Sequence, residues 1–322
     1  MRAFQVETIG AAPQLRDVAT PVPARGQVRV RIMACGLNFA DLLMVKGTYQ
    51  ERPALPFTLG MEMAGVVEAL GPNVTELALG QRVAVFAGMG GLADMGCFDA
   101  RACTPLPDAM GFTDAAAFQV AYGTSHLALN HRARLQQGET LLVMGAAGGV
   151  GLTAVEIGKR MGARVIGTAR GADKLAVAKA AGADHVIDSE AGGLRDALKA
   201  LGGVDVVYDA VGGPAFMEAM RATNPEGRLI PIGFAGGEVP QIPANHLLVK
   251  NLSVIGLYWG GYLKFAPETL SRSMATLFDW YDAGGLRPHI SHEIPLPRAQ
   301  EALDLLRDRK STGKIVVTMT DA

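Results

Sequence analysis

The feature that most constrains the fold is the stretch from Leu141 to Gly151, where a short apolar run meets a cluster of glycines and then a helical pattern. Glycines let a backbone approach a ligand closely, and the free N–H groups at the start of a helix can hold an anion. A strand, a glycine turn and a helix in this order are typical of a dinucleotide-binding unit. The G-x-G-x-x-G pattern is incomplete because Ala146 stands at its first glycine, so the prediction also depends on the surrounding chain.

Short apolar strands alternate with helical stretches over the middle of the chain. The strands are predicted over residues 141–144, 164–168, 185–187, 204–208, 228–232 and 253–257. Strands joined in this way by helices build an open parallel sheet. The sequence therefore predicts an α/β fold with a doubly wound parallel sheet of the Rossmann type, and we assign residues 119–258 to this domain.

The N-terminal part, residues 1–118, has the pattern of a β domain. Residues 27–33 alternate apolar and polar side chains with a period of two, as expected of a strand with one buried face. Further strands are predicted over 65–69 and 81–86, with one helix over 38–46. Glycine and proline separate these segments, which predicts a barrel-like or sandwich-like arrangement.

The C-terminal part holds too few elements for a core of its own. It contains predicted helices over 268–283 and 298–309 and a closing strand over 314–318. We expect residues 259–322 to pack back onto the first domain, which makes that domain discontinuous.

Composition excludes several classes of function. The 322 residues are 49% hydrophobic and 19% charged, and the formal net charge of −1 gives no sign of a nucleic-acid-binding surface. No apolar run reaches the length of about 18 residues that a membrane span needs, and the N-terminus has no apolar signal segment. The three cysteines have no metal-type spacing. A cytoplasmic protein that binds neither nucleic acid nor membrane is expected.

The last predicted strand of the Rossmann domain, within residues 252–257, is apolar and expected at the edge of the sheet. An exposed apolar edge strand promotes association unless it is paired. By analogy with other sheets of this kind, we expect a homodimer in which the edge strands pair.

The end of the second predicted strand of this domain indicates which dinucleotide is bound. NAD-binding sheets usually carry a carboxylate here, on the ribose 2′-hydroxyl. This chain has Thr168 and Arg170 at that point, and Lys174 follows at the start of the next helix. Cations in place of an anion suit the 2′-phosphate of NADPH. Arg170 and Lys174 also fit ordinary surface charges, and Asp173 partly offsets them, but their position favours NADPH.

Several motifs together resemble one protein family. In chain order they are Gly36–Leu42, Gly47–Tyr49, Leu55–Phe57, Gly60–Val67, Ala146–Gly151, Asp209–Gly212, Gly227–Phe234, Leu257–Trp259 and Gly313-Lys314. Over essentially the whole chain they resemble the zinc-free quinone oxidoreductase branch of the medium-chain dehydrogenase/reductase superfamily. The resemblance implies a GroES-like β-barrel catalytic domain beside the Rossmann domain, with the nicotinamide in the cleft between the two.

The resemblance also implies that no metal is bound. Zinc-dependent relatives carry a histidine and two cysteines as ligands, and Met61, Asn38 and Val120 stand at or near those positions here. Thioether, amide and isopropyl groups do not form a catalytic zinc site. The cysteine-rich lobe that holds a structural zinc in those relatives is also absent from the sequence.

Two residues are the catalytic candidates, because the resemblance places Asn38 and Tyr49 beside the nicotinamide. An amide can donate a hydrogen bond to an acceptor oxygen, and a phenol can donate a proton. For Tyr49 a role limited to binding the cofactor stays equally open. Asp41 is expected to be a structural residue at the start of a helix rather than a base.

The remaining cofactor-binding candidates come from the strand ends of the Rossmann domain and from the resemblance. In addition to Asn38, Tyr49, Arg170 and Lys174, they are Ala147, Gly148, Gly149 and Val150 of the glycine turn, Thr168, Ser189 near the adenine, Val211, Gly233, Phe234, Tyr258, Thr124 near the nicotinamide and Arg309 near a phosphate.

Three functions remain open at this point. The leading hypothesis is an NADPH-dependent reductase that transfers a hydride to a quinone, because the family resemblance is to quinone oxidoreductases. An NADPH-dependent reductase of enones or enoyl-CoA esters shares the same chemistry on another electron-poor acceptor. A non-catalytic protein that binds NADPH as a sensor is the third possibility.

Overall fold

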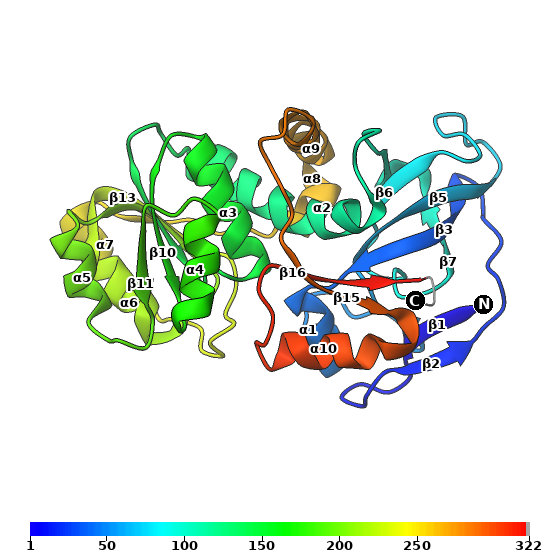
Figure 1. The fold of residues 1–322 in the computed structure, drawn as a ribbon, viewed down its shortest axis with the longest axis horizontal. Helices are drawn as coiled ribbons and strands as arrows, with labels where there is room; N and C mark the ends of the chain where they lie inside the picture. Colours follow the sequence, from blue (N-terminus) through cyan, green and yellow to red (C-terminus); the bar gives the residue numbers. More distant parts are fainter. Residues whose placement is uncertain (320–322) are drawn as a thin grey trace. The chain divides into compact units, whose positions relative to one another are not determined.

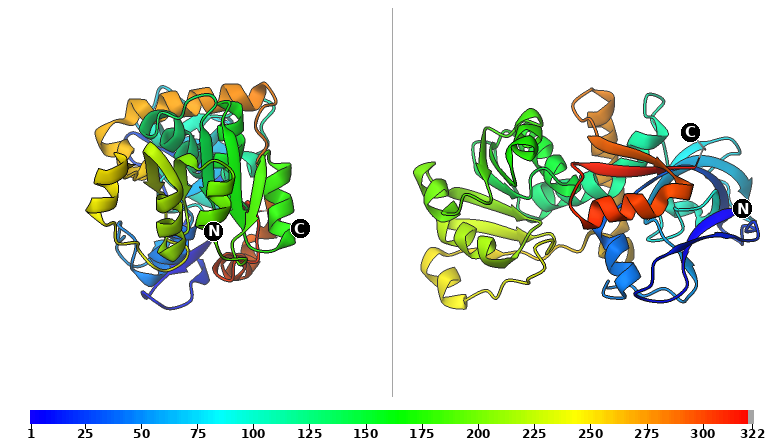
Figure 2. Two further views of the ribbon diagram at one scale, coloured as in Figure 1. Left: turned by 90° about the vertical axis from the view of Figure 1, so that its left-hand side faces the viewer. Right: turned by 60° about the horizontal axis from the view of Figure 1, so that its bottom comes forward.

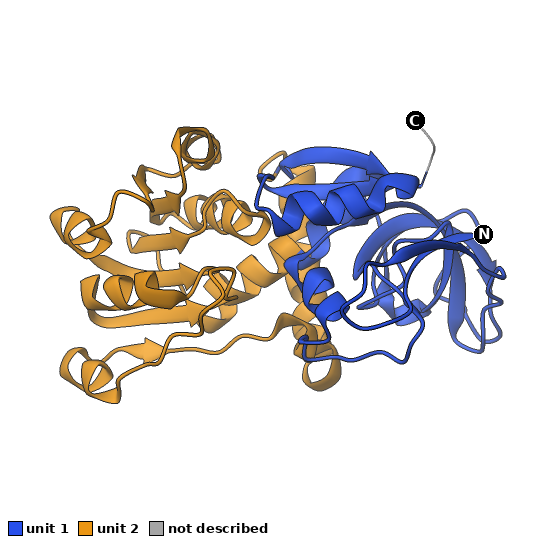
Figure 3. Ribbon diagram, turned by 90° about the horizontal axis from the view of Figure 1, so that it is seen from below, with its two compact units in different colours: residues 1–120, 287–322 blue, residues 121–286 orange. Residues whose placement is uncertain are grey.

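The computed structural model describes residues 1–319, and the chain divides into two compact units. The first unit contains residues 1–120 and the C-terminal segment from Arg287, and the second contains residues 121–286 (Figure 3). The chain passes from the first to the second within helix α2 (Phe112–His126). The first unit is therefore discontinuous in sequence.

The second unit is built on a six-stranded sheet in which all neighbouring strands are parallel, in the order β11-β10-β9-β12-β13-β14. The strand of this sheet that comes first in the sequence, β9, is central, and the strand order reverses between β9 and β12. Because connections between parallel strands share one handedness, this reversal places helices on both faces of the sheet (Figures 1 and 2). The predicted doubly wound sheet is confirmed. Its strands are β9 (Thr140–Met144), β10 (Arg164–Ala169), β11 (His185–Asp188), β12 (Val204–Asp209), β13 (Thr223–Pro231) and β14 (Ser253–Val254).

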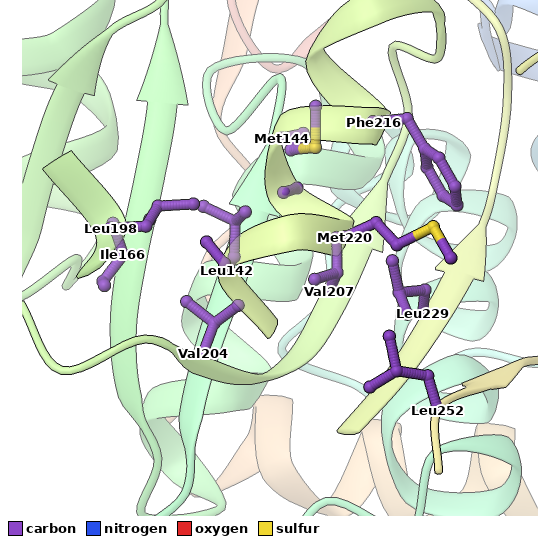
Figure 4. Close-up of a cluster of buried hydrophobic side chains, with 12 residues drawn as sticks. Leu142, Met144, Ile166, Leu198, Val204, Val207, Phe216, Met220, Leu229 and Leu252 are labelled. Carbon is purple, nitrogen blue, oxygen red and sulfur yellow. The ribbon is translucent and has the colours of Figure 1, made fainter. Parts of the chain in front are cut away.

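The helices of this unit pack on faces set by the alternation of side chains along each strand. Leu141 on β9 lies against Gly158 of one helix, whereas its neighbour Leu142 belongs to a cluster with Leu198 and Phe216 on the opposite face (Figure 4). The helices that connect the strands of this sheet are α3 (Gly149–Arg160), α4 (Ala172–Ala180), α5 (Leu194–Ala200), α6 (Gly213–Ala222) and α7 (Ala244–Lys250). Gly158 lies on α3, Leu198 on α5 and Phe216 on α6. Among residues 1–319, no helix combines the length and the apolar character that crossing a membrane requires.

The first unit is mostly β and carries two sheets. The larger has the order β15-β16-β3-β5-β6-β8, with β7 also paired to β3, and the smaller has the order β2-β1-β4. Two helices, α1 (Phe39–Lys46) and α10 (Ala299–Arg307), and the first part of α2 complete it. The strands are β1 (Arg2–Val6), β2 (Gln14–Asp17), β3 (Gln27–Gly36), β4 (Phe57–Thr58), β5 (Glu62–Leu70), β6 (Arg82–Phe86), β7 (Met95–Asp99), β8 (Cys103–Pro105), β15 (Ile290–Pro295) and β16 (Lys314–Thr318).

Strand β3 organises this unit and confirms the predicted alternation. Val28, Val30 and Ile32 are buried, while Arg31 between them is exposed. At its C-terminal end β3 pairs antiparallel with β16, with Gly36 opposite Val316. The pairing brings β16 beside the residues that lead into α1.

Residues 259–286 are the main difference from the predicted organisation, because they belong to the second unit. They form α8 (Tyr262–Phe265) and α9 (Pro267–Asp282), which follow the 3-10 turn η3 (Trp259–Gly261). Ser273 of α9 is hydrogen-bonded to His126 of α2 (Oγ–Nδ1 2.7 Å), and the guanidinium of Arg160 lies over the ring of Trp280. These contacts, between residues distant in sequence, hold α9 to the second unit. The predicted strand over 253–257 is also shorter than expected, because its pairing with β13 ends early.

Candidate functional site

The carboxyl ends of the parallel strands gather most of the predicted cofactor-binding residues at one edge of the sheet. Strands that run parallel end at the same edge, so the residues after them lie near one another. The residues at this edge are Ala147, Gly148, Gly149 and Val150 after β9, Thr168 and Arg170 at the end of β10, Ser189 after β11, Val211 after β12, Gly233 and Phe234 after β13, and Tyr258 after β14. Lys174 lies in the first turn of α4.

The turn between β9 and α3 closes through the backbone. Gly145 has a φ of 75°, which favours glycine, and its carbonyl accepts a hydrogen bond from Gly148 N–H (3.0 Å). Gly148 is the N-cap of α3, and the N–H groups of the residues that follow it have no partner within the helix by geometry. A methyl group on Gly151 would collide with the carbonyl oxygen of Gly145, so a glycine is required there.

The incomplete glycine pattern has a local explanation. Ala146 stands where a glycine is usual, and its methyl group points toward Gly167 on the neighbouring strand β10. A Cβ placed on Gly167 would lie 2.9 Å from the Cβ of Ala146. Gly167, which has no side chain, thus leaves the space that the methyl group of Ala146 needs. The backbone hydrogen bond from Ala146 N–H to Thr168 O is still formed, at 2.8 Å.

Arg170, at the end of β10, lies near the carboxylate of Glu190, which the sequence analysis does not identify. Its Nε is 3.7 Å from Oε1 of Glu190, and both side chains are at least half exposed. The sequence had pointed to Asp173 as the nearby anion. Thr168, in contrast, is buried at 4% exposure. Arg170 is therefore a solvent-accessible cation at this edge, partly neutralised by Glu190.

Two buried polar groups that the sequence did not reveal support this edge. Asp209 at the end of β12 accepts hydrogen bonds from Val211 N–H (2.8 Å) and Gly212 N–H (3.0 Å), and burial raises the pKa of its carboxyl. Ser125, beside the predicted Thr124 on α2, donates to Val150 O (2.9 Å) and also contacts the Tyr208 hydroxyl (2.8 Å). The motif Asp209–Gly212 was the available signal for the first group.

In the first unit, Asn38 lies within a buried cluster of charged groups. Lys314 Nζ donates to Oδ1 of Asn38 (2.8 Å) and to Oε1 of Glu62 (2.7 Å). Asn38 Nδ2 donates to the same Glu62 oxygen (2.9 Å). Lys314 and Glu62 are buried, whereas Asn38 is half-buried. Glu62 and Lys314 appeared in the sequence motifs, but no local signal indicated that they meet.

Asp41 is a structural residue at the start of α1, as expected. Its Oδ2 accepts a hydrogen bond from Asn38 N–H (2.8 Å), and its Oδ1 accepts one from Gly60 N–H (3.2 Å). Burial raises the pKa of Asp41 to about 6, against the effect of these two N–H donors and of Lys314. The carboxylate fixes the backbone of Asn38 as one half of a capping box at the start of α1.

Two further predicted residues, Tyr49 and Arg309, belong to loops of the first unit. Tyr49 is half-buried and follows Gly47, which ends α1 with a φ of 68°. Arg309 is exposed after α10 with a φ of 56°. The cofactor contacts of both residues stay predictions. Among residues 1–319, no three His, Cys, Asp or Glu side chains are grouped in a way that suits a metal ion.

Two protein-family models match the chain. The model described as "Zinc-binding dehydrogenase" matches residues 149–279, and the model described as "Alcohol dehydrogenase GroES-like domain" matches residues 24–108. A GroES-like domain and a Rossmann domain in this order define the class of medium-chain dehydrogenases/reductases.

Similar proteins narrow the class. The quinone oxidoreductase-like protein 2 homolog of Nematostella vectensis is 42% identical over 323 residues, which cover 98% of this chain and 88% of that protein. The quinone oxidoreductase of Thermus thermophilus, whose structures include a complex with NADPH, is 34% identical, with a TM-score of 0.88 over 99% of this chain and 100% of that one. The Escherichia coli quinone oxidoreductase complexed with NADPH is 29% identical, with a TM-score of 0.91 and the same coverage. The chain belongs to the quinone oxidoreductase-like branch of the medium-chain dehydrogenase/reductase superfamily, and its predicted fold and enzyme class are confirmed.

Proposed function

We propose that the protein is an NADPH-dependent reductase that transfers a hydride to a quinone without a metal ion. The observation that carries this proposal is the charge at the end of β10, where Arg170 stands in place of the carboxylate of NAD-binding sheets. Two structural relatives were determined with NADPH, which supports the same cofactor here. The names of the relatives support the quinone as acceptor.

The residues of the second unit fit this cofactor. The nearest atom to a Cβ built on Gly148 is the Gly145 carbonyl oxygen at 3.4 Å, so the face of the turn is open to a pyrophosphate. The N–H groups of Gly149 and Val150 at the start of α3 suit its negative charge. Arg170 suits the 2′-phosphate. The further proposed contacts are Thr124, Ala147, Thr168, Lys174, Ser189, Val211, Gly233, Phe234, Tyr258 and Arg309.

The chemistry assigned to the protein itself is binding, orientation and proton supply. When bound, NADPH supplies the hydride. Asn38 donates a hydrogen bond to the acceptor oxygen as negative charge develops on it, because the amide N–H that makes only the 3.4 Å hydrogen bond to Gly36 O is a neutral donor. Tyr49 delivers a proton to the reduced acceptor or orients the cofactor.

The metal-free part of the proposal rests on the charges around Asn38. The ammonium group of Lys314 is 2.8 Å from Asn38 Oδ1, the oxygen that would have to face a cation. The nearby carboxylate, Glu62, already neutralises this ammonium at 2.7 Å. A divalent cation at Asn38 would therefore meet a fixed positive charge, and Glu62 could not balance both.

One experiment tests this function and separates it from its alternatives. The purified protein is mixed with NADPH and, in turn, with quinones, enones and enoyl-CoA esters, and NADPH oxidation is followed by absorbance. Turnover of quinones at the highest kcat/KM supports the proposal. Turnover of enones or enoyl-CoA esters alone identifies an enoyl reductase, and tight NADPH binding without any turnover identifies a sensor.

We also propose a homodimer through the edge strand β14. This strand ends the sheet, and the preceding helix α7 exposes Leu248 (77%) and Val249 (72%). Apolar side chains beside an edge strand favour association with a second copy. Sedimentation velocity tests this, since Leu248→Lys with Val249→Lys is expected to shift a dimer toward monomer. A wild-type protein that sediments as a monomer contradicts the proposal.

A further inference from the structure

We infer that Lys314 and Glu62 form a positioning pair that fixes which way the Asn38 amide faces and strengthens its N–H as a donor. This inference rests on the proposed role of Asn38 toward the acceptor. Its basis is a set of three hydrogen bonds that join Lys314 Nζ to Asn38 Oδ1, Lys314 Nζ to Glu62 Oε1, and Asn38 Nδ2 to Glu62 Oε1.

Lys314 and Glu62 distinguish the oxygen of the Asn38 amide from its nitrogen, although the two atoms are alike in size and shape. An ammonium group only donates hydrogen bonds and a carboxylate only accepts them. In the observed orientation Asn38 Oδ1 faces Lys314 and Nδ2 faces Glu62. Rotating the amide by half a turn would place NH₂ against the ammonium and C=O against the carboxylate. Both contacts would become repulsive, and burial of the pair makes the repulsion stronger.

Other hydrogen bonds hold the Lys314–Glu62 pair in place, so the pair does not reorient when the Asn38 amide rotates. The third hydrogen bond of Lys314 goes to Leu37 O at 2.7 Å, and the second oxygen of Glu62 accepts from Val120 N–H at 2.8 Å. Asp41 holds the backbone N–H of Asn38 at the same time. Neither the cation, the anion nor the backbone has freedom to rearrange, so the amide has one favoured orientation.

This orientation leaves a donor for the acceptor. Nδ2 carries two N–H groups; one donates to Glu62 at 2.9 Å, and the other makes only a long hydrogen bond of 3.4 Å to Gly36 O, which an acceptor oxygen can replace. Asn38 is half-buried, so the protein does not fully enclose the residue. The ammonium on Oδ1 draws electron density from the amide, which makes the N–H a better donor to a developing oxyanion. Lys314 thus acts through Asn38 and does not contact the acceptor.

A double-mutant cycle on kcat tests whether Lys314 acts through Asn38. Wild type, Asn38→Ala, Lys314→Met and the double variant are compared at saturating NADPH with a quinone as the varied substrate. Lys314→Met is expected to lower kcat by at least about 10-fold with little change in the Kd of NADPH. In the Asn38→Ala background the same substitution is expected to change kcat by less than about 2-fold. Equal losses in both backgrounds, or an unchanged kcat in Lys314→Met, overturn the inference.

Loss of folding is controlled by two further variants. Lys314→Met with Glu62→Gln leaves no uncompensated buried charge in the pair and replaces Lys314→Met in the cycle if that variant does not fold. Val28→Ala removes packing at the far end of β3 from Gly36 and reports what lowered stability alone does to kcat. A loss of kcat in Val28→Ala equal to that in the Lys314 variant would overturn the positioning role.

The orientation of the amide is also measured without turnover. In protein labelled with ¹⁵N on asparagine, the Asn38 side-chain signals are identified by their loss in Asn38→Ala. We expect one pair of amide proton signals in the wild type, with one proton protected from exchange, and loss of this protection in Lys314→Met. An identical spectrum in both proteins overturns the inference. If the wild type reduces no acceptor, the proposed function fails, and this measurement still decides the orientation.

Discussion

Lys314 donates a hydrogen bond to the side-chain oxygen of Asn38 at 2.8 Å, although 276 positions separate the two residues in the chain. Lys314 opens β16 and Asn38 precedes α1, and the pairing of β16 with β3 brings them together. The contact explains how β16 takes part in the candidate site. It also makes the site dependent on the stability of this one strand pair.

Removing the Lys314 ammonium is expected to destabilise the protein. Lys314→Met leaves the buried Glu62 carboxylate without its counter-charge, which costs about 3–5 kcal/mol in the free energy of unfolding. Adding Glu62→Gln is expected to recover part of the loss. Urea denaturation followed by fluorescence measures both, and a loss below about 1 kcal/mol in Lys314→Met would contradict a close buried pair.

Arg170 is expected to select NADPH over NADH. Arg170→Ala should raise the KM of NADPH by about 10-fold and leave that of NADH unchanged, because only NADPH carries the 2′-phosphate. Glu190→Gln should lower the KM of NADPH, because it removes the carboxylate 3.7 Å from Arg170. Steady-state kinetics with each cofactor measures this. Arg272→Ala, on the exposed side of α9, is the matched control, and an equal effect on NADH would show that the 2′-phosphate is not what Arg170 binds.

Two glycines of the turn are expected to respond differently to the same change. Gly151→Ala places a methyl group against the Gly145 carbonyl oxygen, so the turn must distort and the melting temperature should fall. Gly148→Ala meets nothing closer than 3.4 Å, so its melting temperature should hold while its affinity for NADPH falls. Thermal melting and a fluorescence titration with NADPH separate the two effects. A Gly151→Ala variant that melts like the wild type would contradict the close approach to Gly145, and normal NADPH binding by Gly148→Ala would contradict the pyrophosphate site.

His126 is expected to make stability rise with pH below neutrality. Burial lowers the pKa of His126 from 6.5 to about 4 in the folded state. The unfolded chain therefore binds more protons between pH 4 and 6.5, and stability falls as pH falls through this range. The slope from one such group is at most about 1.4 kcal/mol per pH unit. His126→Gln should remove this part of the slope in urea denaturation, and parallel curves for variant and wild type would contradict it.

Chelators are expected to leave the activity unchanged. The side chains at the positions of the zinc ligands of relatives, Met61, Asn38 and Val120, are poor ligands, and the ammonium of Lys314 lies beside Asn38. Incubation with 1,10-phenanthroline followed by the NADPH oxidation assay measures this, and elemental analysis should find zinc well below one atom per chain. Loss of activity that added zinc restores would disprove the metal-free proposal.

Much of the fold was predictable because its signals are local. Strands buried on both faces appear as apolar runs, and such runs predict β9, β10 and β12. The alternation in β3 predicted one buried face, and the structure confirms it. Residues 259–286 belong to the second unit and not, as the sequence predicts, to the first, because their attachment depends on Ser273 and Trp280 meeting distant residues of α2 and α3.

The sequence by itself determined the doubly wound sheet, the glycine turn from Gly145 to Gly151 and the cation at Arg170, since strand periodicity, glycine geometry and side-chain charge are properties of short segments. Only the tertiary structure decided that Glu190 lies beside Arg170 and that Lys314 and Glu62 hold the Asn38 amide. Those contacts depend on how strands pair and in which register. A register is set by the packing of the whole sheet, which no short segment contains.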